Sequence, residues 1–298
     1  MHNLLILDGA MGTMLQAAGM KAGEHPEVFG FDNPEIVKNI HLKYIESGSN
    51  VIYTNTFGAN AHKLEGCKID VDTAVKTAIK SAKEAIDESK RDVKVALDIG
   101  PIGELLEPLG VLRFEDAYEI YKEMVVAGEK YGADIIIFET FTDLYDVRAG
   151  VLAAKENTNL PVWVTMTYET TGRTFTGTKI ESMAVTLEGL GVDAIGFNCS
   201  LGPKEILPLA KKLKEWTNLP IIIKPNAGLP NPSTGEYDLH AADFAKLMAD
   251  YKSIGISYAG GCCGTSPEFI SELKKEFENR KFSEIKPAKV KTGICSGN

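Results

Sequence analysis

Cysteine, tryptophan and histidine are scarce in this sequence, and no long apolar run occurs. Its 298 residues include 5 cysteines, 2 tryptophans and 5 histidines. A small and odd number of cysteines does not suit a disulfide framework, so we expect free thiols and a reducing, cytoplasmic location. No apolar stretch approaches the ~20 residues of a membrane-spanning helix. The first residues, Met1-His2-Asn3, do not begin a leader typical of a signal peptide.

Runs rich in lysine or arginine are also absent. The chain carries 32 basic and 41 acidic side chains, which gives a formal net charge of -9. An acidic chain repels phosphate backbones and anionic lipid surfaces, so neither nucleic acid nor a membrane is an expected partner. The hydrophobic fraction of 44% is instead typical of a globular protein with a large core.

Eight short runs rich in valine, isoleucine and leucine recur along the chain, and each ends in small or polar residues. They lie at 4–7, 51–53, 93–97, 135–138, 162–166, 194–197, 221–223 and 256–259. Short continuous apolar runs are typical of strands that are buried on both faces of a parallel sheet.

Segments with helical periodicity separate these runs. A helix start is predicted at Asn33-Pro34, and further helices at 72–90, 114–131, 144–157, 183–190, 203–216, 239–254 and 267–277. Eight strand–helix units predict a single-domain (β/α)8 TIM barrel over residues 1–282, followed by a linker or tail over 283–298. An open doubly wound sheet is the alternative. Polar residues after all eight strands favour the barrel, because none of the strands has the pattern of an edge strand.

In such a barrel the active site lies at the carboxyl ends of the strands. Polar or thiol side chains that follow the predicted strands would therefore share one rim. These are Asp8, Thr54, Asn55, Asp98, Glu139, Asn198, Cys199, Asn226, Cys262 and Cys263.

Three of these rim residues are cysteines. Cys262 and Cys263 are adjacent within a glycine cluster, and Cys199 ends the sixth strand. Thiolates are good zinc ligands, and three protein ligands with one open position are typical of a catalytic zinc. Neighbouring side chains of a strand point to opposite faces, so the backbone must turn for both cysteines to reach one ion. Gly260, Gly261 and Gly264 are expected to permit the dihedral angles of that turn.

Alternatives remain open for several of these features. The cysteine pair also fits two small buried residues or a vicinal disulfide, while Cys67 and Cys295 are expected to be bystanders. The segment from Asp8 to Thr13 suits either a phosphate-binding turn or a simple strand-to-loop turn. Glu139 suits either a substrate ligand or a salt-bridged barrel carboxylate. Asn226 either approaches a metal before substrate arrives or caps its own loop.

Five motifs together resemble the zinc-dependent homocysteine S-methyltransferases, and most closely their cobalamin-dependent, methionine-forming members. The motifs are Asp8-Gly9-Ala10-Met11-Gly12-Thr13, Thr54-Asn55-Thr56-Phe57, Phe138-Glu139-Thr140-Phe141, Asn198-Cys199-Ser200 and Gly260-Gly261-Cys262-Cys263-Gly264-Thr265. The resemblance runs from about residue 5 to residue 277. One departure is Ala10, where many relatives have a second glycine.

The resemblance implies a set of ligands for metal and substrate. Zinc would be held by Cys199, Cys262 and Cys263. The position of Asn226 after the seventh strand, rather than the resemblance, makes it a further candidate ligand when substrate is absent. The sulfur of L-homocysteine would take the fourth position. The amino acid end of the substrate would be held by Asp8, Gly9 and Glu139, with Thr54 and Asn198 as neighbours.

The resemblance also implies methyl transfer to L-homocysteine to give L-methionine. Methylcobalamin would be the donor, carried by another module, and cobalamin-binding and folate-binding modules would be partners in cis or in trans. A free-standing enzyme that uses betaine, S-methylmethionine or S-adenosylmethionine is the alternative. More distant alternatives are a zinc or redox module without chemistry of its own, and a barrel aldolase with Lys224 as a Schiff-base lysine.

Overall fold

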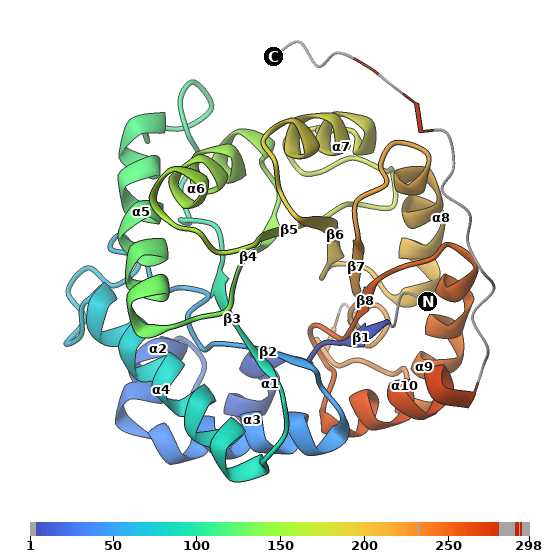
Figure 1. Cartoon of the computed structure of the whole chain (residues 1–298), viewed down its shortest axis with the longest axis horizontal. Coiled ribbons are helices and arrows are strands. Elements are labelled where there is room, and N and C mark those ends of the chain that lie inside the picture. The colour runs from blue at the N-terminus through green and yellow to red at the C-terminus, as the bar shows by residue number, and fades with distance from the viewer. Residues whose placement is uncertain (1–3, 232, 280–289, 292, 294–298) are drawn as a thin grey trace.

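Eight parallel strands form a ring at the centre of the molecule, with helices around it (Figure 1). The structure is a computed structural model that describes residues 4–231, 233–279, 290, 291 and 293. The strands are β1 (Leu5–Ile6), β2 (Val51–Tyr53), β3 (Lys94–Ile99), β4 (Ile135–Phe141), β5 (Val162–Met166), β6 (Ala194–Asn198), β7 (Ile221–Lys224) and β8 (Tyr258–Ala259). Their order is β1-β8-β7-β6-β5-β4-β3-β2, and a parallel bridge between Leu7 and Val51 joins β1 to β2. The predicted TIM barrel is confirmed.

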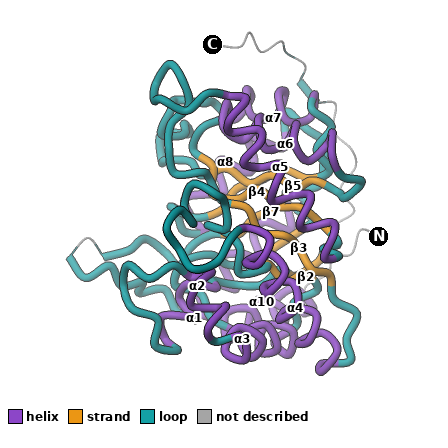
Figure 2. Tube along the Cα trace, turned by 90° about the vertical axis from the view of Figure 1, so that its left-hand side faces the viewer, coloured by secondary structure: helices purple, strands orange, loops and turns teal. Residues whose placement is uncertain are grey.

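The helices lie outside the strands, and the longer loops gather on one side of the molecule (Figure 2). They are α1 (Met11–Ala17), α2 (Pro26–Asp32), α3 (Pro34–Ser47), α4 (Val71–Ser89), α5 (Phe114–Tyr131), α6 (Leu144–Asn157), α7 (Ile180–Gly189), α8 (Pro203–Lys214), α9 (Ala241–Ala249) and α10 (Pro267–Asn279). None of the helices in the described parts of the chain has the length and apolar content needed to span a membrane.

Several predicted boundaries differ from the structure. The helices α1 and α2 were not predicted, because seven residues give fewer than two turns in which to recognise a period. The predicted helix at 239–254 ends at Ala249 and continues as a 3-10 helix, η1 (Asp250–Ser253). The helix α7 begins at Ile180 rather than at residue 183. Residue 282, most of the predicted tail, and Cys295 lie outside the described residues.

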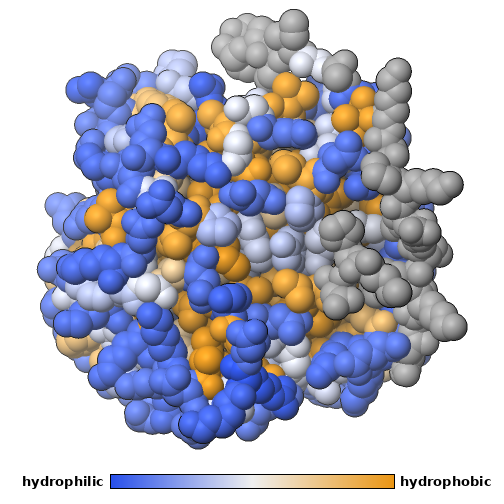
Figure 3. Space-filling model, in the orientation of Figure 1, coloured by the Kyte–Doolittle hydropathy of each residue, from blue (hydrophilic) through white to orange (hydrophobic). Residues whose placement is uncertain are grey.

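Two apolar layers make up the core. Side chains of alternate strand residues point outwards, where they pack against the helices, and the remainder point into the barrel. The face shown in Figure 3 has polar residues over the helices and apolar residues between them. The inner layer is made by Leu7, Val51, Tyr53, Ala96, Ile135, Ile137, Trp163, Ala194 and Ile222.

This alternation places polar side chains directly above the inner apolar layer. Two residues beyond an inward-pointing residue, the next side chain also points inwards. The residues in this position are Asp98 after Ala96, Glu139 after Ile137, Thr165 after Trp163, and Lys224 after Ile222, and all are buried. The barrel therefore holds a polar layer on an apolar floor, at the carboxyl ends of the strands.

Candidate functional site

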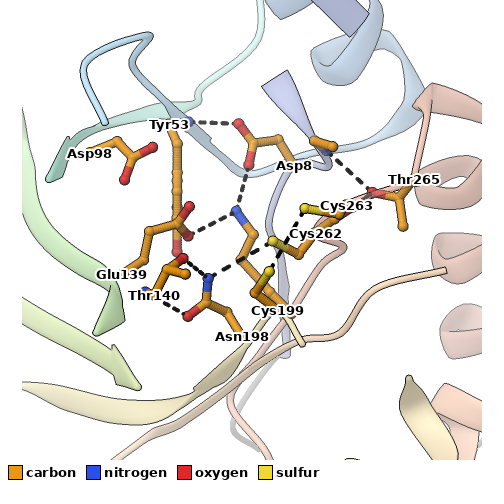
Figure 4. A network of polar contacts seen from close by, with 12 residues as sticks. Asp8, Tyr53, Asp98, Glu139, Thr140, Asn198, Cys199, Cys262, Cys263 and Thr265 are labelled. Atoms are coloured by element: carbon orange, nitrogen blue, oxygen red, sulfur yellow. Dashed lines mark hydrogen bonds and ion pairs between the residues drawn. The ribbon is translucent and has the colours of Figure 1, made fainter. Parts of the chain in front are cut away.

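Three thiols meet at the carboxyl end of the barrel (Figure 4). Cys199 follows β6, while Cys262 and Cys263 follow β8, and their sulfur atoms all lie within 4.8 Å of one another. The sulfur atoms of Cys199 and Cys263 are 3.7 Å apart. Four ligands at a Zn–S distance of ~2.3 Å in a tetrahedron have their sulfur atoms ~3.8 Å apart, so the three thiols fit zinc. All three are free thiols, so the alternative of a vicinal disulfide is not present.

The glycines around the cysteine pair have two different roles. Gly264 has a φ of 79°, in the left-handed region that favours glycine. Gly260 and Gly261 are needed for space instead. A Cβ atom at Gly260 would lie 2.6 Å from the Asp8 carbonyl oxygen, and one at Gly261 would lie 2.5 Å from Thr265 Oγ1. The expectation that all three permit special dihedral angles is therefore correct only for Gly264, because close packing of the β1 and β8 loops decides the other two.

Cys199 is held in a strained conformation. Its φ is 59°, and that of Ser200 is 55°, although both residues carry a Cβ atom. Such left-handed residues cost free energy and persist where the surrounding structure requires them, often at functional sites. The backbone N–H of Cys199 donates to the Lys224 carbonyl oxygen at 3.1 Å, which ties the strained residue to β7.

The thiols also influence one another electrostatically. Hydrogen bonds with the thiols of Cys199 and Cys262 lower the pKa of Cys263 to about 3, while the pKa values of Cys199 and Cys262 are raised within the same cluster. A thiolate is therefore present at neutral pH, and thiolate is the form in which cysteine binds metal.

A buried ion pair lies in the polar layer beside the thiols. Lys224 Nζ is 3.1 Å from Asp8 Oδ1 and 3.8 Å from Glu139 Oε2. It also lies 3.4 Å from the centroid of the Tyr53 ring, over which a cation is favoured. Burial alone lowers the pKa of Lys224, but the charges of Asp8 and Glu139 outweigh it, and the pKa lies well above its usual value. Lys224 is therefore an ammonium ion, which is not the nucleophile that a Schiff-base aldolase needs.

The ion pair bears on the predicted roles of Asp8 and Glu139 as substrate ligands. The structure brings both predicted substrate ligands together, and it also gives Glu139 the salt bridge that was its structural alternative. Lys224 was considered only as a Schiff-base residue. Its position two residues beyond the inward-pointing Ile222 is the sequence signal that places it in the barrel.

Asn198 connects the carboxylate strand to the thiols. Its side-chain oxygen accepts the Thr140 N–H at 2.8 Å, and its Nδ2 donates to Thr140 Oγ1 at 2.7 Å. The same nitrogen lies 3.9 Å from Cys262 Sγ (Figure 4). Thr140 has a φ of 66° at a register shift between Phe138 and Phe141, an unusual conformation for a β-branched residue. Sequence reasoning missed Thr140, because this strain is visible only in the backbone.

Gly9 and Thr54, two further predicted substrate residues, have contacts within the protein. Thr54 Oγ1 lies 2.6 Å from Thr56 Oγ1 and accepts the Asp98 N–H at 3.1 Å. A Cβ atom at Gly9 would lie 2.8 Å from Thr265 Oγ1, so this turn packs tightly against the cysteine loop. The Ala10 N–H donates to the same oxygen at 3.2 Å, which supports a packed strand-to-helix turn rather than a phosphate-binding turn.

Asn226 is buried beside the cysteine pair. Its Oδ1 atom has no hydrogen-bond partner, so the predicted alternative, in which this oxygen caps its own loop, is not formed. Hydrogen bonds on both sides fix its backbone: the Cys262 N–H donates to Pro225 O at 2.8 Å, and the Ala227 N–H donates to Cys263 O at 2.9 Å. The side-chain oxygen is therefore a buried acceptor without a partner, on a loop whose backbone is hydrogen-bonded to the cysteine pair.

Comparisons with known proteins point to one protein family. Residues 5–277 match the family described as Homocysteine S-methyltransferase. Methionine synthase of Mycobacterium tuberculosis (strain ATCC 25618 / H37Rv) is 32% identical over 95% of this chain and 25% of its own length. Methionine synthase of Mycobacterium leprae (strain TN) is 33% identical over 91% of this chain and 24% of its own length. The chain thus spans about a quarter of these relatives.

The fold is shared with solved structures of the homocysteine methyltransferase MmuM from Escherichia coli. The oxidized form has a TM-score of 0.78 at 24% identity, covering 91% of this chain and 95% of that one. The metallated form has a TM-score of 0.77 at 22% identity, covering 91% and 96%. Since the family match covers most of the barrel, this chain belongs to the homocysteine S-methyltransferase family.

Proposed function

We propose that this chain transfers a methyl group to the thiol of L-homocysteine to give L-methionine, as the homocysteine-activating module of a cobalamin-dependent methionine synthase. The observation that carries the proposal is the convergence of three thiols within 4.8 Å of one another, beside a buried layer of carboxylates. The first group suits a metal that activates sulfur, and the second suits the ammonium end of an amino acid.

The three thiols would activate the substrate sulfur through zinc. Cys199, Cys262 and Cys263 would hold zinc and leave one position for the substrate sulfur. When bound, zinc would lower the pKa of an incoming thiol from about 8.5, so that the sulfur reacts as a thiolate.

The remaining site residues would hold the amino acid end of the substrate. Asp8 and Glu139 would face the ammonium, Gly9 would permit close approach of the backbone, and Thr54 and Asn198 would support this arrangement. Oriented in this way, the sulfur attacks the donor methyl carbon in line. The new S–CH3 bond forms as the bond from the donor to the methyl breaks, and its electron pair remains with the donor.

The methyl donor is proposed to be methylcobalamin carried by another module. The relatives are about four times as long as this chain, which leaves room for cobalamin-binding and folate-binding modules. Exposed apolar side chains on loops that follow β3, β5 and β7 also support docking at the carboxyl end of the barrel; these are Leu109, Val111, Phe175 and Leu229. Residues 283–298 would then be the linker. A cytoplasmic location stays a prediction.

A free-standing methyltransferase is the second candidate, with betaine, S-methylmethionine or S-adenosylmethionine as donor. The observation behind this candidate is the fold that the chain shares with the homocysteine methyltransferase MmuM. An assay of methionine formation from homocysteine with the four donors in parallel separates the two. We expect slow turnover with free methylcobalamin and faster turnover when a cobalamin-binding module is added. Saturable turnover with betaine, at rates that methylcobalamin does not reach, would favour the second candidate.

Asn226 is proposed as a metal ligand before substrate arrives. Asn226 lies between Pro225 and Ala227, whose backbone hydrogen bonds join this loop to the cysteine pair, and its buried side-chain oxygen has no partner. A neutral amide oxygen is a weak ligand, so an incoming thiolate displaces it readily. X-ray absorption of zinc-loaded protein is expected to report three sulfurs and one oxygen without homocysteine, and four sulfurs with it. Water also gives an oxygen signal, so Asn226→Ala is the control. An unchanged spectrum and unchanged homocysteine affinity in that variant would remove Asn226 from the site.

A further inference from the structure

Three carboxylates and one lysine meet at the polar layer of the barrel: Asp98, Glu139 and Lys224 belong to this layer, and Asp8, which follows β1, contacts it through Lys224. Asp8 already uses both of its oxygens: Oδ1 lies 3.1 Å from Lys224 Nζ, and Oδ2 accepts the Tyr53 N–H at 2.7 Å. The other two carboxylates, Asp98 and Glu139, are only 6% and 9% exposed. Lys224 is the only lysine or arginine in this layer among the residues that the structure describes, so the carboxylates outnumber the positive charge beside them. Burial, together with the charge of Glu139, accordingly raises the pKa of Asp98 well above its usual value.

Asp98 and Glu139 each keep a buried oxygen without a hydrogen-bond partner. These atoms are Asp98 Oδ1 and Glu139 Oε2, although the latter lies 3.8 Å from Lys224 Nζ. A buried carboxylate oxygen without a partner is unfavourable, and such atoms in a folded protein need an explanation. Figure 4 shows the two side chains on the same side of the polar layer, with the Asp98 carboxylate directed towards Glu139 and Tyr53.

Hydrogen bonds to neighbouring residues fix the backbone of Asp98 near the end of β3. Its N–H donates to Thr54 Oγ1 at 3.1 Å, and its carbonyl oxygen accepts from Thr56 Oγ1 at 2.7 Å. These bonds fix the backbone of β3 where the side chain enters the barrel. The free carboxylate oxygen is therefore held in place rather than left on a flexible loop.

We propose that Asp98 is a specificity-determining residue, which together with Glu139 binds the α-ammonium group of the amino acid substrate. The inference rests on the proposed function and adds Asp98 to Asp8 and Glu139: Asp8 contributes its charge near the ammonium, while Asp98 and Glu139 supply the oxygens that have no partner. An ammonium ion has three N–H donors, and it would give both unpartnered oxygens a charged hydrogen bond. It would also supply the positive charge that Lys224 alone does not. A thiol without an ammonium group leaves both oxygens unpaired, so the site selects α-amino acid thiols.

Asp98→Asn tests the proposal, because asparagine keeps the shape of the side chain and removes its charge. Affinity is measured by calorimetry on zinc-loaded protein, and KM and kcat are measured with the donor that supports turnover. Two thiols are compared: homocysteine, and 4-mercaptobutanoate, which has the same carbon chain and carboxylate but no ammonium. We expect Asp98→Asn to weaken homocysteine binding by about 10- to 100-fold, as for the loss of a hydrogen bond to a charged group. Binding of 4-mercaptobutanoate is expected to change by less than about twofold.

Two further variants make the result specific. Glu139→Gln is expected to show the same dependence on the ammonium group, with zinc content unchanged. Asp243→Asn removes an exposed carboxylate on α9 and is expected to leave both affinities unchanged. Thermal denaturation should show Asp98→Asn close in stability to the wild type at neutral pH, because the shape of the side chain is kept and the raised pKa of Asp98 already disfavours its charged form without substrate.

The outcomes separate this inference from the proposed function. Equal weakening of both thiols, or no weakening of homocysteine binding, would overturn the role of Asp98. The second result is the one expected if Asp98 is protonated and serves only as a neutral hydrogen-bond donor. If wild-type protein with zinc neither binds nor methylates homocysteine, the proposed function itself fails.

Discussion

Replacing Cys263 by serine is expected to abolish zinc binding and lower homocysteine methylation by about 100-fold or more. Its sulfur lies 3.7 Å from that of Cys199, the separation that a shared tetrahedral ion requires. A serine hydroxyl is a harder and much weaker ligand for zinc than a thiolate. Loss of even the outer partners of a metal ligand costs about 10- to 100-fold in affinity or activity, so loss of a ligand costs at least as much. Zinc content per chain and the rate of methionine formation measure the effect.

Folding is expected to survive this change, because Cys263 belongs to neither apolar layer of the core. The control is Cys67→Ser, which changes a free cysteine that packs against the outer layer, away from the thiol cluster. That variant should keep one zinc per chain and full activity. If Cys263→Ser also keeps one zinc and wild-type activity, the three thiols are not the metal site.

Replacing Lys224 by methionine is expected to lower the free energy of unfolding by about 3–5 kcal/mol at pH 8. The lysine side chain is 3% exposed and lies 3.1 Å from Asp8 and 3.8 Å from Glu139. Methionine has a similar length but no charge, so both carboxylates remain buried without a counterion. Breaking a buried ion pair costs more than the pair itself contributes, because the remaining charges stay desolvated. Urea denaturation measures the difference.

The loss should depend on pH. Burial raises the pKa of Asp8 and of Glu139, and in the wild type the charge of Lys224 opposes this. Without Lys224 the folded-state pKa values rise further above those of the unfolded chain. A raised carboxyl pKa lowers stability as pH rises through the interval between the unfolded and folded values. The variant should therefore lose less stability at pH 5 than at pH 8.

A surface ion pair provides the comparison. Lys246 and Asp243 are 3.1 Å apart, with side chains 66% and 57% exposed. Lys246→Met is expected to cost less than about 1 kcal/mol, because water screens such pairs. Wild-type stability of Lys224→Met at pH 8, or the same loss at pH 5 and pH 8, would show that Lys224 is not the counterion of the barrel carboxylates.

The sequence by itself determined the buried strands and the three thiols that meet at their carboxyl ends. Short runs of branched apolar residues predict buried parallel strands, and β2 and β5 have the bounds that were predicted. The cysteine pair within its glycines is a local pattern, so it could be recognised without the fold. Residues that follow strands could be assigned to one rim, because all strands of such a barrel end on the same side.

Only the tertiary structure decided how these side chains pair. The ion pair of Lys224 with Asp8 joins residues 216 positions apart, and no local period encodes such a contact. The strained Thr140 exchanges two hydrogen bonds with Asn198 of another strand: its N–H donates to Asn198 Oδ1, and its Oγ1 accepts from Asn198 Nδ2. The need for glycine at 260 comes from atoms of Leu7 and Asp8 on another loop, and the need for glycine at 261 comes from Thr265, four residues further along the same loop. Local preferences act within a few residues, whereas the charge balance and spacing of the site depend on which strand ends the closed barrel brings together.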